Sequence, residues 1–218
     1  MAGLVERDRL RPVVKSRPDR AGPGRRPGSR PDTPVAMSAA DPVARVDAWL
    51  DEFIVGLDIC PFARLPLQRG QVHLVATDSR DLPDILADVL VEARRLDEDG
   101  VGTTLLILPR APADFDDFLD ICYAAEDALS AAGFDRRVQV VGFHPDYVFH
   151  GAPPDDPANA VNRSPVPLLH LLRWQDVRDA IEGHRDIGEV PRRNARLLRE
   201  RAGTAGACPH RSSQRGEG

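Results

Sequence analysis

Residues able to do chemistry are concentrated between Phe143 and Arg173, in the stretch FHPDYVFHGAPPDDPANAVNRSPVPLLHLLR. It contains three histidines, two arginines, a tyrosine and several carboxylates. The residues before it, 138–143, are apolar in the pattern of a strand, so these polar groups follow a strand end. Binding and catalytic groups collect on loops that a rigid scaffold positions. We therefore expect the working site of the protein in this stretch.

The strongest candidate for acid–base catalysis is His144, because an unperturbed imidazole titrates near pH 6.5 and Asp146 can orient it. His170, further along the same stretch, is a second catalytic candidate. Together the two histidines and Asp146 would also make a two-histidine, one-carboxylate metal site. In the structural alternative, His144 and Asp146 only cap the strand end and tie down the loop. The residues alone leave these interpretations open.

A candidate nucleophile is Cys60, whose reactivity depends on the backbone around it. If Cys60 merely follows a helix, the negative end of that helix raises the pKa of its thiol. If Pro61 to Arg64 begin a helical turn, Cys60 becomes its N-cap and the effect is reversed. A buried cysteine that packs as a small hydrophobic residue is the simpler alternative.

Further residues suggest that the ligand is an anion. Ser164 followed by Pro165 predicts the N-cap and first residue of a short helix, and the free amides of a helix start bind anions. Arg163 and Arg173 would add guanidinium groups. Alternatively, these arginines pair with carboxylates of the loop and pin it. Other candidate substrate-binding residues are Tyr147, Asn162 and Asn194.

Helical and strand patterns alternate along the chain and predict an α/β fold. The fold class we expect is a three-layer arrangement, with a small, mostly parallel sheet of about three strands flanked by helices. Ligands of such sheets bind beyond the carboxyl ends of the strands, which here include Thr77, Pro109 and His144. The expected strands are 72–76, 103–108 and 138–143. The expected helices are about 42–58, 82–96, 166–174, 176–183 and 191–201, with a further helix that starts at Pro112 and Asp114 and ends before Gly133.

Composition divides the chain into a single α/β domain, residues 41–201, between two flexible tails. Residues 1–40 predict a disordered basic arm, because the first 36 contain six prolines and no aromatic residue and cannot bury enough apolar surface to fold. We hypothesise that translation starts near Met37. Residues 202–218 predict a disordered tail.

Charge and cysteine content limit the classes of partner and compartment. Residues 1–40 hold nine basic and four acidic side chains, so the rest of the chain carries −10 within the total of −5. An acidic domain is not expected to bind nucleic acid. Three cysteines without a metal-type pair suit a reducing compartment, and no apolar run is long enough for a membrane helix. We expect a cytoplasmic protein with no membrane partner.

Several ordered motifs resemble those of a bacterial family catalogued as domain of unknown function 1415, over about residues 46–198. This resemblance implies kinship and supplies no activity. The motifs are Cys60-Pro61-Phe62-Ala63, Thr104-Leu105-Leu106-Ile107, Phe143-His144-Pro145-Asp146-Tyr147, Pro154-Asp155-Asp156, Asn162-Arg163-Ser164-Pro165, Leu169-His170-Leu171-Leu172-Arg173 and Pro191-Arg192-Arg193-Asn194.

Three functional hypotheses remain. The first is a small enzyme, a hydrolase or group transferase, that acts on an anionic small molecule at the 143–173 loop. No dinucleotide fingerprint or phosphate-binding glycine loop is present, so no cofactor is expected. The second is a non-catalytic anion-binding or adaptor module. The third is a metal-dependent enzyme using His144, Asp146 and His170. The sequence does not indicate the oligomeric state.

Overall fold

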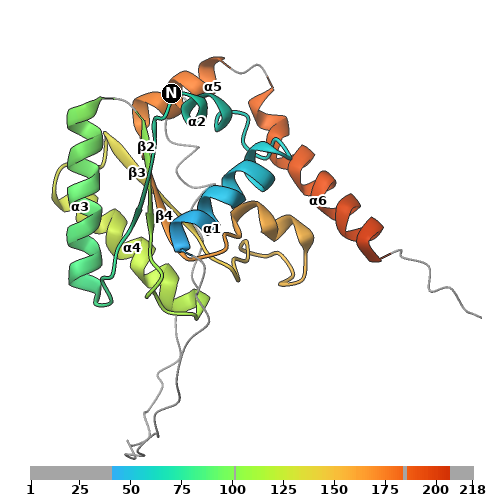
Figure 1. Ribbon diagram of the computed structural model, residues 1–218, viewed down its shortest axis with the longest axis horizontal. Helices are drawn as coiled ribbons and strands as arrows, with labels where there is room; N and C mark the ends of the chain where they lie inside the picture. The colour runs from blue at the N-terminus through green and yellow to red at the C-terminus, as the bar shows by residue number, and fades with distance from the viewer. Residues whose placement is uncertain (1–40, 101, 184–185, 207–218) are drawn as a thin grey trace, which may run out of the picture.

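A four-stranded mixed sheet lies at the centre of the structure, with helices on both of its faces (Figure 1). The structure is a computed structural model that describes residues 41–100, 102–183 and 186–206. The strands are β1 (Val72–Ala76), β2 (Thr103–Ile107), β3 (Val138–Phe143) and β4 (Leu168–Arg173). The α/β class is therefore confirmed, and β1 and β3 have the predicted bounds.

The strand order is β1-β2-β4-β3. β1 and β2 pair in parallel, and β4 lies antiparallel between β2 and β3. Strands β1, β2 and β3 consequently end at one edge of the sheet, here called the carboxyl edge. β4 begins at the carboxyl edge, with Leu168 opposite Ile107 and Phe143, and ends at the other edge, with Arg173 opposite Val138.

The prediction of a helix at 166–174, and with it the prediction of three mostly parallel strands, is wrong. Residues 168–173 form β4, which makes the sheet four-stranded and mixed. Leu169 and Leu171 join the core on one face, whereas Leu168 joins the core on the other. A strand buried on both faces reads as a continuous apolar run, which periodicity cannot distinguish from a short buried helix.

Helices α3 (Leu82–Asp99) and α4 (Phe115–Ala131) cover one face of the sheet. α4 begins at Asp114, whose carboxylate accepts hydrogen bonds from the amides of Asp116 and Asp117. α3 ends at Gly100, which has a φ of 69° that favours glycine. Their shared core with the sheet includes Ile85, Val89, Leu96, Leu106, Phe118, Leu129 and Leu169.

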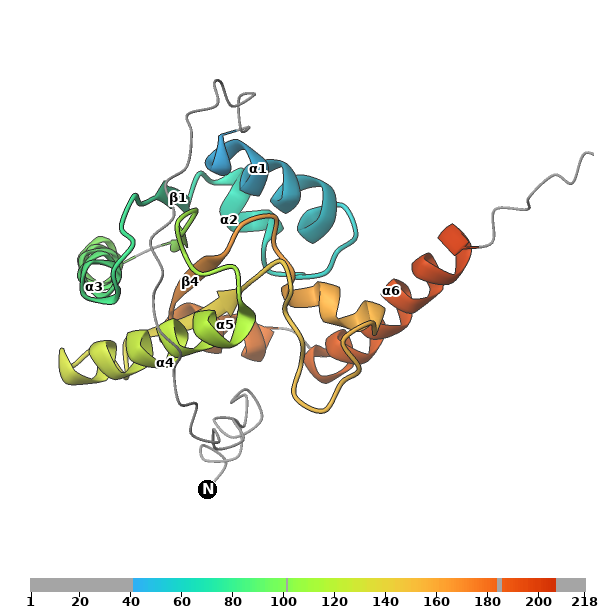
Figure 2. The ribbon, with the colours of Figure 1, turned by 90° about the horizontal axis from the view of Figure 1, so that it is seen from below.

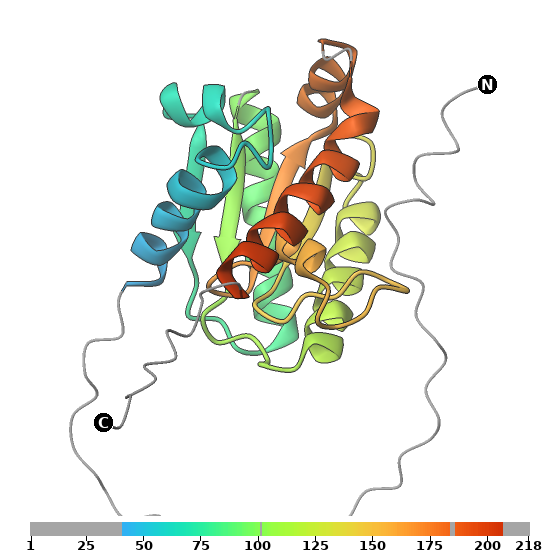
Figure 3. The ribbon, with the colours of Figure 1, turned by 90° about the vertical axis from the view of Figure 1, so that its right-hand side faces the viewer.

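The opposite face is covered by α1 (Pro42–Trp49), the π-helix η1 (Leu50–Val55), α2 (Arg64–Gln68) and α6 (Val190–Gly206). Figure 3 shows α1 and α6 in front of the sheet, with α4 behind it. The helix predicted at 42–58 is thus α1 followed by a π-helical segment that ends at Val55. α6 extends beyond the predicted end at residue 201, into the segment expected to be a tail.

Three shorter elements complete the described chain. The 3-10 helix η2 (Pro157–Asn162) lies in the loop between β3 and β4, α5 (Trp174–Gly183) follows β4 directly, and the 3-10 helix η3 (Ile187–Glu189) precedes α6. α6 packs against η2, as the view from below shows (Figure 2). In the described residues, no helix combines the length and apolar character needed to span a membrane.

Gly142 is required for close packing between β3 and α4. A methyl group at this position would lie 2.6 Å from Sγ of Cys122 and 3.1 Å from the ring of Phe118. We expect Gly142→Ala to lower the free energy of unfolding by about 1–3 kcal/mol through overpacking, measured by urea denaturation. Gly203→Ala, which adds its methyl group in open space on α6, is the control and should not destabilise. Equal stability of both variants would contradict this account of the β3–α4 contact.

Candidate active site at the carboxyl edge

His144 lies at the carboxyl edge, directly after β3, and its imidazole is only 1% exposed. Side chains alternate between the two faces of a strand. Gly142 faces α4, and His144, two residues on, packs on the same helix. Its ring centroid lies 5.1 Å from that of Phe118 and 5.6 Å from that of Phe115. The predicted strand-end histidine is therefore buried beneath the first turn of α4.

The two ring nitrogens of His144 have different environments. Nδ1 accepts a hydrogen bond from the backbone amide of Asp146 at 3.1 Å. In the neutral imidazole, the proton must therefore be on Nε2. Nε2 is buried, and no group in the described part of the chain forms a hydrogen bond with it. His144 thus holds a fixed tautomer whose N–H donor is unused.

The electrostatic environment of His144 favours the neutral ring. Burial lowers its pKa, and the carbonyl of Pro112 and the carboxylates of Asp146 and Asp114 partly oppose that shift. The carbonyl of Pro112 acts as a backbone hydrogen-bond partner of the ring in raising this pKa, although Nε2 forms no hydrogen bond of normal length and angle. A neutral imidazole with carboxylates nearby can take up and release a proton close to neutral pH.

A series of aromatic rings connects His144 with the surface. Phe115 contacts both His144 and Tyr147, the latter at a centroid distance of 5.0 Å. Tyr147 in turn contacts Phe149, which is 37% exposed, again at 5.0 Å. Burial raises the pKa of Tyr147, against a hydrogen bond with Asn162 that lowers it. Tyr147 is therefore separated from His144 by the ring of Phe115, and the carbonyl of Asn162 accepts a hydrogen bond from the amide of His144 at 3.2 Å.

Arg163 holds the loop through carbonyl oxygens. Its Nε donates to the carbonyl of Tyr147 at 3.0 Å, and its NH2 group donates to that of Pro154 at 2.8 Å. In the residues that the structure describes, no carboxylate forms an ion pair with Arg163. The expected alternative, in which carboxylates of the loop neutralise this arginine, is therefore not observed, and its positive charge remains near the site.

Two other contacts of the loop escaped the sequence interpretation. Asn159 is fully buried; it accepts from the amide of Phe149 at 3.1 Å and donates to the carbonyl of Pro153 at 2.8 Å. Asp156 forms a bidentate ion pair with Arg199 of α6, at 3.0 and 2.7 Å, and this hydrogen bonding lowers the pKa of Asp156 to about 2. In the sequence, the only signal for the role of Asn159 is its place after Asp156-Pro157-Ala158, and that signal is weak.

His170 does not join His144, because the two imidazoles lie on opposite faces of the sheet. His170 alternates with Leu169 and Leu171 on β4, and its ring lies 6.2 Å from that of Phe143. Its Nε2 donates to Oγ1 of Thr103 at 2.7 Å, since the Thr103 hydroxyl proton is used by the carbonyl of Leu171. The proposed metal set of His144, Asp146 and His170 is therefore not assembled, and the described chain contains no group of three potential ligands for a metal.

The predicted anion site at a helix start is also not formed. No helix begins at Pro165; Ser164 is buried, and its hydroxyl donates to the carbonyl of Val166 at 2.6 Å. Arg173 lies at the other edge of the sheet, where it bonds the carbonyl of Gly100 and the carboxylate of Asp176. Both errors follow from the strand β4, which carries the chain away from the carboxyl edge.

Cys60 and Asn194 belong to the α1/α6 side of the sheet. Cys60 is partly buried there and begins a turn that leads into α2; burial raises the pKa of its thiol, while the amides of Phe62 and Ala63 oppose the change. Asn194 is buried on α6 and donates to the carbonyl of Ile59 at 2.7 Å. Asn194 therefore holds the backbone before Cys60 and does not face His144.

The partly buried imidazole of His170 should make stability depend on pH. Burial lowers its folded pKa to about 4, against about 6.5 in an unfolded chain. The stabilisation is complete above about pH 6.5 and is lost as the pH falls towards 4, by up to about 3 kcal/mol. We expect His170→Leu to flatten the curve of unfolding free energy against pH in this window, measured by urea denaturation. Parallel curves for the two proteins would contradict this assignment.

Asn159 should be essential for the order of the loop. Asn159→Ala leaves the amide of Phe149 and the carbonyl of Pro153 without their partners, which costs about 1–3 kcal/mol. Hydrogen exchange of residues 145–156 should become faster, as measured by mass spectrometry. Gln175→Ala removes an exposed amide that bonds only its neighbour Asp179 and is the control. Unchanged exchange in the loop of Asn159→Ala would contradict this role.

The comparisons with known proteins identify a family and no activity. Residues 41–206 match the family described as "Protein of unknown function (DUF1415)". No curated protein and no solved structure matches the chain. The matched residues include the whole sheet, the loop that follows His144 and the helix α6 that holds it. The chain therefore belongs to the DUF1415 family.

Proposed function

We propose that the protein is a small enzyme, a hydrolase or group transferase, that acts on an anionic small molecule at the carboxyl edge of the sheet. His144 is the general acid–base. The observation that carries this proposal is the buried Nε2 of His144, which forms no hydrogen bond of normal geometry in the described chain and interacts only weakly with the carbonyl of Pro112.

An unused donor in this position requires a reason. Most buried polar side-chain atoms have a hydrogen-bond partner, and an unsatisfied one costs about 1–3 kcal/mol. The backbone amide of Asp146 fixes the tautomer and directs the proton to Nε2. A substrate oxygen that accepts a hydrogen bond from Nε2 satisfies this donor. When the ring is the imidazolium, with protons on both nitrogens, Nε2 gives its proton to that oxygen and the neutral imidazole remains. The carboxylates of Asp146 and Asp114 favour the imidazolium from which this proton leaves.

The anionic character of the substrate is supported by Arg163. Its guanidinium contacts only neutral carbonyl oxygens in the described chain, so its charge is not cancelled within the loop. Arg163 is bonded to the backbone of Tyr147, whose ring packs on Phe115 next to His144. A phosphate or carboxylate group that enters beside Tyr147 would be attracted by the positive charge of Arg163. Of the sequence-predicted anion-binding groups, Arg163 is the one that the fold leaves at the carboxyl edge.

Access to His144 requires movement of the side chains that cover it. Phe115 packs on the imidazole and Tyr147 packs on Phe115, and the neighbouring Asp146 and Phe149 are exposed. Rotation of these rings on an otherwise pinned loop would open the site without unfolding it. Such a cover excludes water from the reaction, which suits group transfer as well as hydrolysis. We place the enzyme in the cytoplasm of a bacterium, on the strength of its cysteine content and of the family resemblance.

A non-catalytic module is the second candidate, and the hydrogen bonds of the loop favour it. Asn159, Arg163 and the Asp156–Arg199 pair together hold residues 147–159 in one conformation. A loop held at so many points can present a rigid binding surface. In that case His144 fills space beneath α4, and its chemistry is not used.

His144→Asn separates the two candidates. The asparagine carbonyl can accept the bond from the Asp146 amide, so the loop keeps its anchor while Nε2 is lost. The full chain is first screened by thermal shift against phosphorylated and carboxylated metabolites. Turnover of each ligand that raises Tm is then followed by mass spectrometry. We expect His144→Asn to lower turnover by about 100-fold to 10,000-fold at nearly unchanged Tm, whereas His170→Asn, a partly buried histidine on the opposite face, should keep turnover.

The matched test of the anion site compares two arginines that pin the same loop. Arg163→Gln should abolish the ligand-induced rise in Tm. Arg199→Gln breaks only the contact with Asp156 and should retain that rise. No ligand in the screen, or full turnover in His144→Asn, would overturn the enzyme proposal. A large loss of stability in His144→Asn without loss of turnover would favour the non-catalytic module.

A further inference from the structure

β1 is an edge strand, with β2 as its only neighbour in the sheet. The amide of Thr103 donates to the carbonyl of Gln71, and the amide of Thr77 donates to the carbonyl of Ile107. In a parallel ladder the residues of one strand bond alternately to the two sides. The backbone groups of Leu74 and Ala76 therefore point away from β2, in the plane of the sheet.

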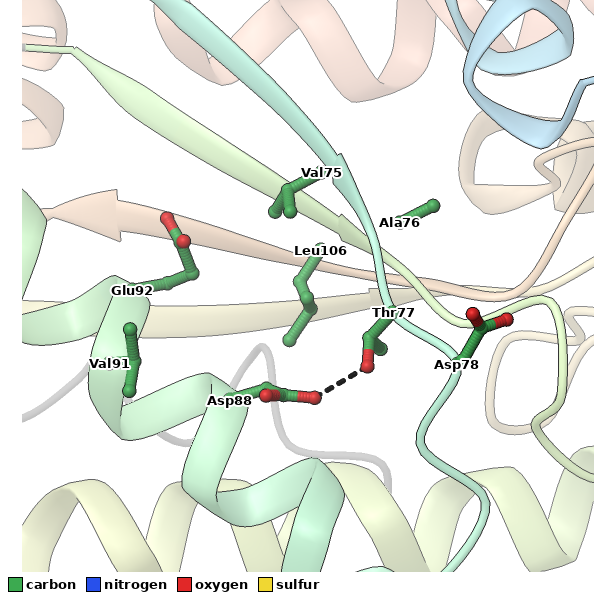
Figure 4. A pocket seen from close by; sticks show the side chains of 8 residues that line it. All are labelled: Val75, Ala76, Thr77, Asp78, Asp88, Val91, Glu92 and Leu106. Atoms are coloured by element: carbon green, nitrogen blue, oxygen red, sulfur yellow. Dashed lines mark hydrogen bonds between the residues drawn. The ribbon is translucent and has the colours of Figure 1, made fainter.

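A hollow of about 260 Å³ lies alongside the edge strand β1, between β1 and α3 (Figure 4). Its floor is apolar and consists of Val75 and Leu106. Val91 of α3 lines its wall and is 60% exposed, which is high for an apolar side chain on a helix that packs against a sheet. The hollow can therefore accept the aliphatic part of a side chain that approaches alongside β1.

The polar lining of the hollow is acidic. Oδ2 of Asp88 accepts bonds from the hydroxyls of Thr77 and Ser79, at 2.6 and 2.8 Å. These bonds hold the Asp88 carboxylate at the hollow, with Oδ1 still available as an acceptor. Asp78, at the mouth, has no ion-pair partner within the described part of the chain. Glu92 is neutralised by Arg95 at 2.9 Å, so the uncompensated charge comes from Asp78 and Asp88.

We propose that the edge strand β1 binds an extended segment of a partner protein as a fifth strand of the sheet, with a lysine or arginine side chain of the partner in the hollow. The backbone of the segment pairs with Leu74 and Ala76, as in other cases of strand addition to an exposed sheet edge. The aliphatic stem of the basic side chain lies on Val75 and Val91, and its charged end reaches Asp88. The backbone supplies affinity, and the acidic hollow supplies specificity for a cationic residue.

Charge complementarity selects this occupant over a second copy of the chain. Parallel pairing of β1 with another β1 would bring the Asp78 and Asp88 carboxylates of both copies together, and like charges across an interface oppose association. Antiparallel pairing would leave each acidic hollow without a cationic partner from the other strand. The whole chain outside residues 1–40 carries −10, which adds long-range attraction for a basic segment. A cationic strand satisfies both the unpaired backbone and the acidic hollow, whereas a second β1 satisfies only the backbone.

The test uses the full chain and a fluorescein-labelled peptide, Thr-Val-Arg-Val-Arg-Val-Thr, with blocked ends. Binding is measured by fluorescence anisotropy, and a peptide with glutamate in place of both arginines is the control. Ala76→Pro removes an outward amide that β2 does not use, and proline is tolerated at such edge positions. Asp88→Asn removes the charge and keeps an acceptor for Thr77 and Ser79. Asp120→Asn, on α4 at the β3 side of the sheet, is the matched control for loss of one charge.

We expect the arginine peptide to bind and the glutamate peptide not to bind. Ala76→Pro should weaken binding at least about tenfold and Asp88→Asn about threefold to tenfold, whereas Asp120→Asn should leave it unchanged. If Ala76→Pro lowers Tm strongly, the decision rests on Asp88→Asn and on whether the amide resonances of Leu74 and Ala76 shift during an NMR titration of the unaltered protein. Equal binding by Asp88→Asn and Asp120→Asn, no shift at these amides, or concentration-dependent dimerisation that excludes the peptide would each overturn the proposal.

Discussion

The position of β4 determines the arrangement of the rest of the molecule. The last strand in the sequence lies between β2 and β3 and runs against both of them. Because of this reversal, the chain leaves the carboxyl edge after Leu168 and reaches the opposite edge at Arg173. It also separates the two candidate catalytic histidines, since His170 lies on the face covered by α1 and α6 while His144 packs on α4.

Three independent sets of contacts hold His144 and the loop after it at the carboxyl edge. The first turn of α4 covers His144 through Phe115 and Phe118. The buried Asn159 gathers the loop by bonding its backbone on two sides. α6 then fixes the loop from outside through Arg199 and Asp156. Because each of these contacts involves a different part of the chain, the imidazole of His144 stays in one orientation even though the loop above it is long.

Features that neighbouring residues determine could be predicted from the sequence, whereas features that depend on distant parts of the chain could not. β1 and β3 were predicted because alternation and flanking turns are local signals. β4 was missed because burial on both faces removes the alternation from Leu168 to Arg173. His144 was located correctly from its place at a strand end. His170 and Arg173 were placed wrongly, because the additional reversed strand puts His170 on the other face of the sheet and Arg173 at the other edge. Ser164 does not begin a helix, because the residues after it lead into this strand.

The insertion of β4 also has a consequence for synthesis of the protein on the ribosome. β2 and β3 do not touch each other, so the sheet cannot close until residue 173 has emerged, and α6 must follow before Asn194 and Arg199 can bond their partners. Until then, the nascent chain exposes the apolar surface of β2, which is buried on both faces in the finished molecule. Long-range closure of this kind is slow, and apolar surface that is exposed in the interval promotes aggregation.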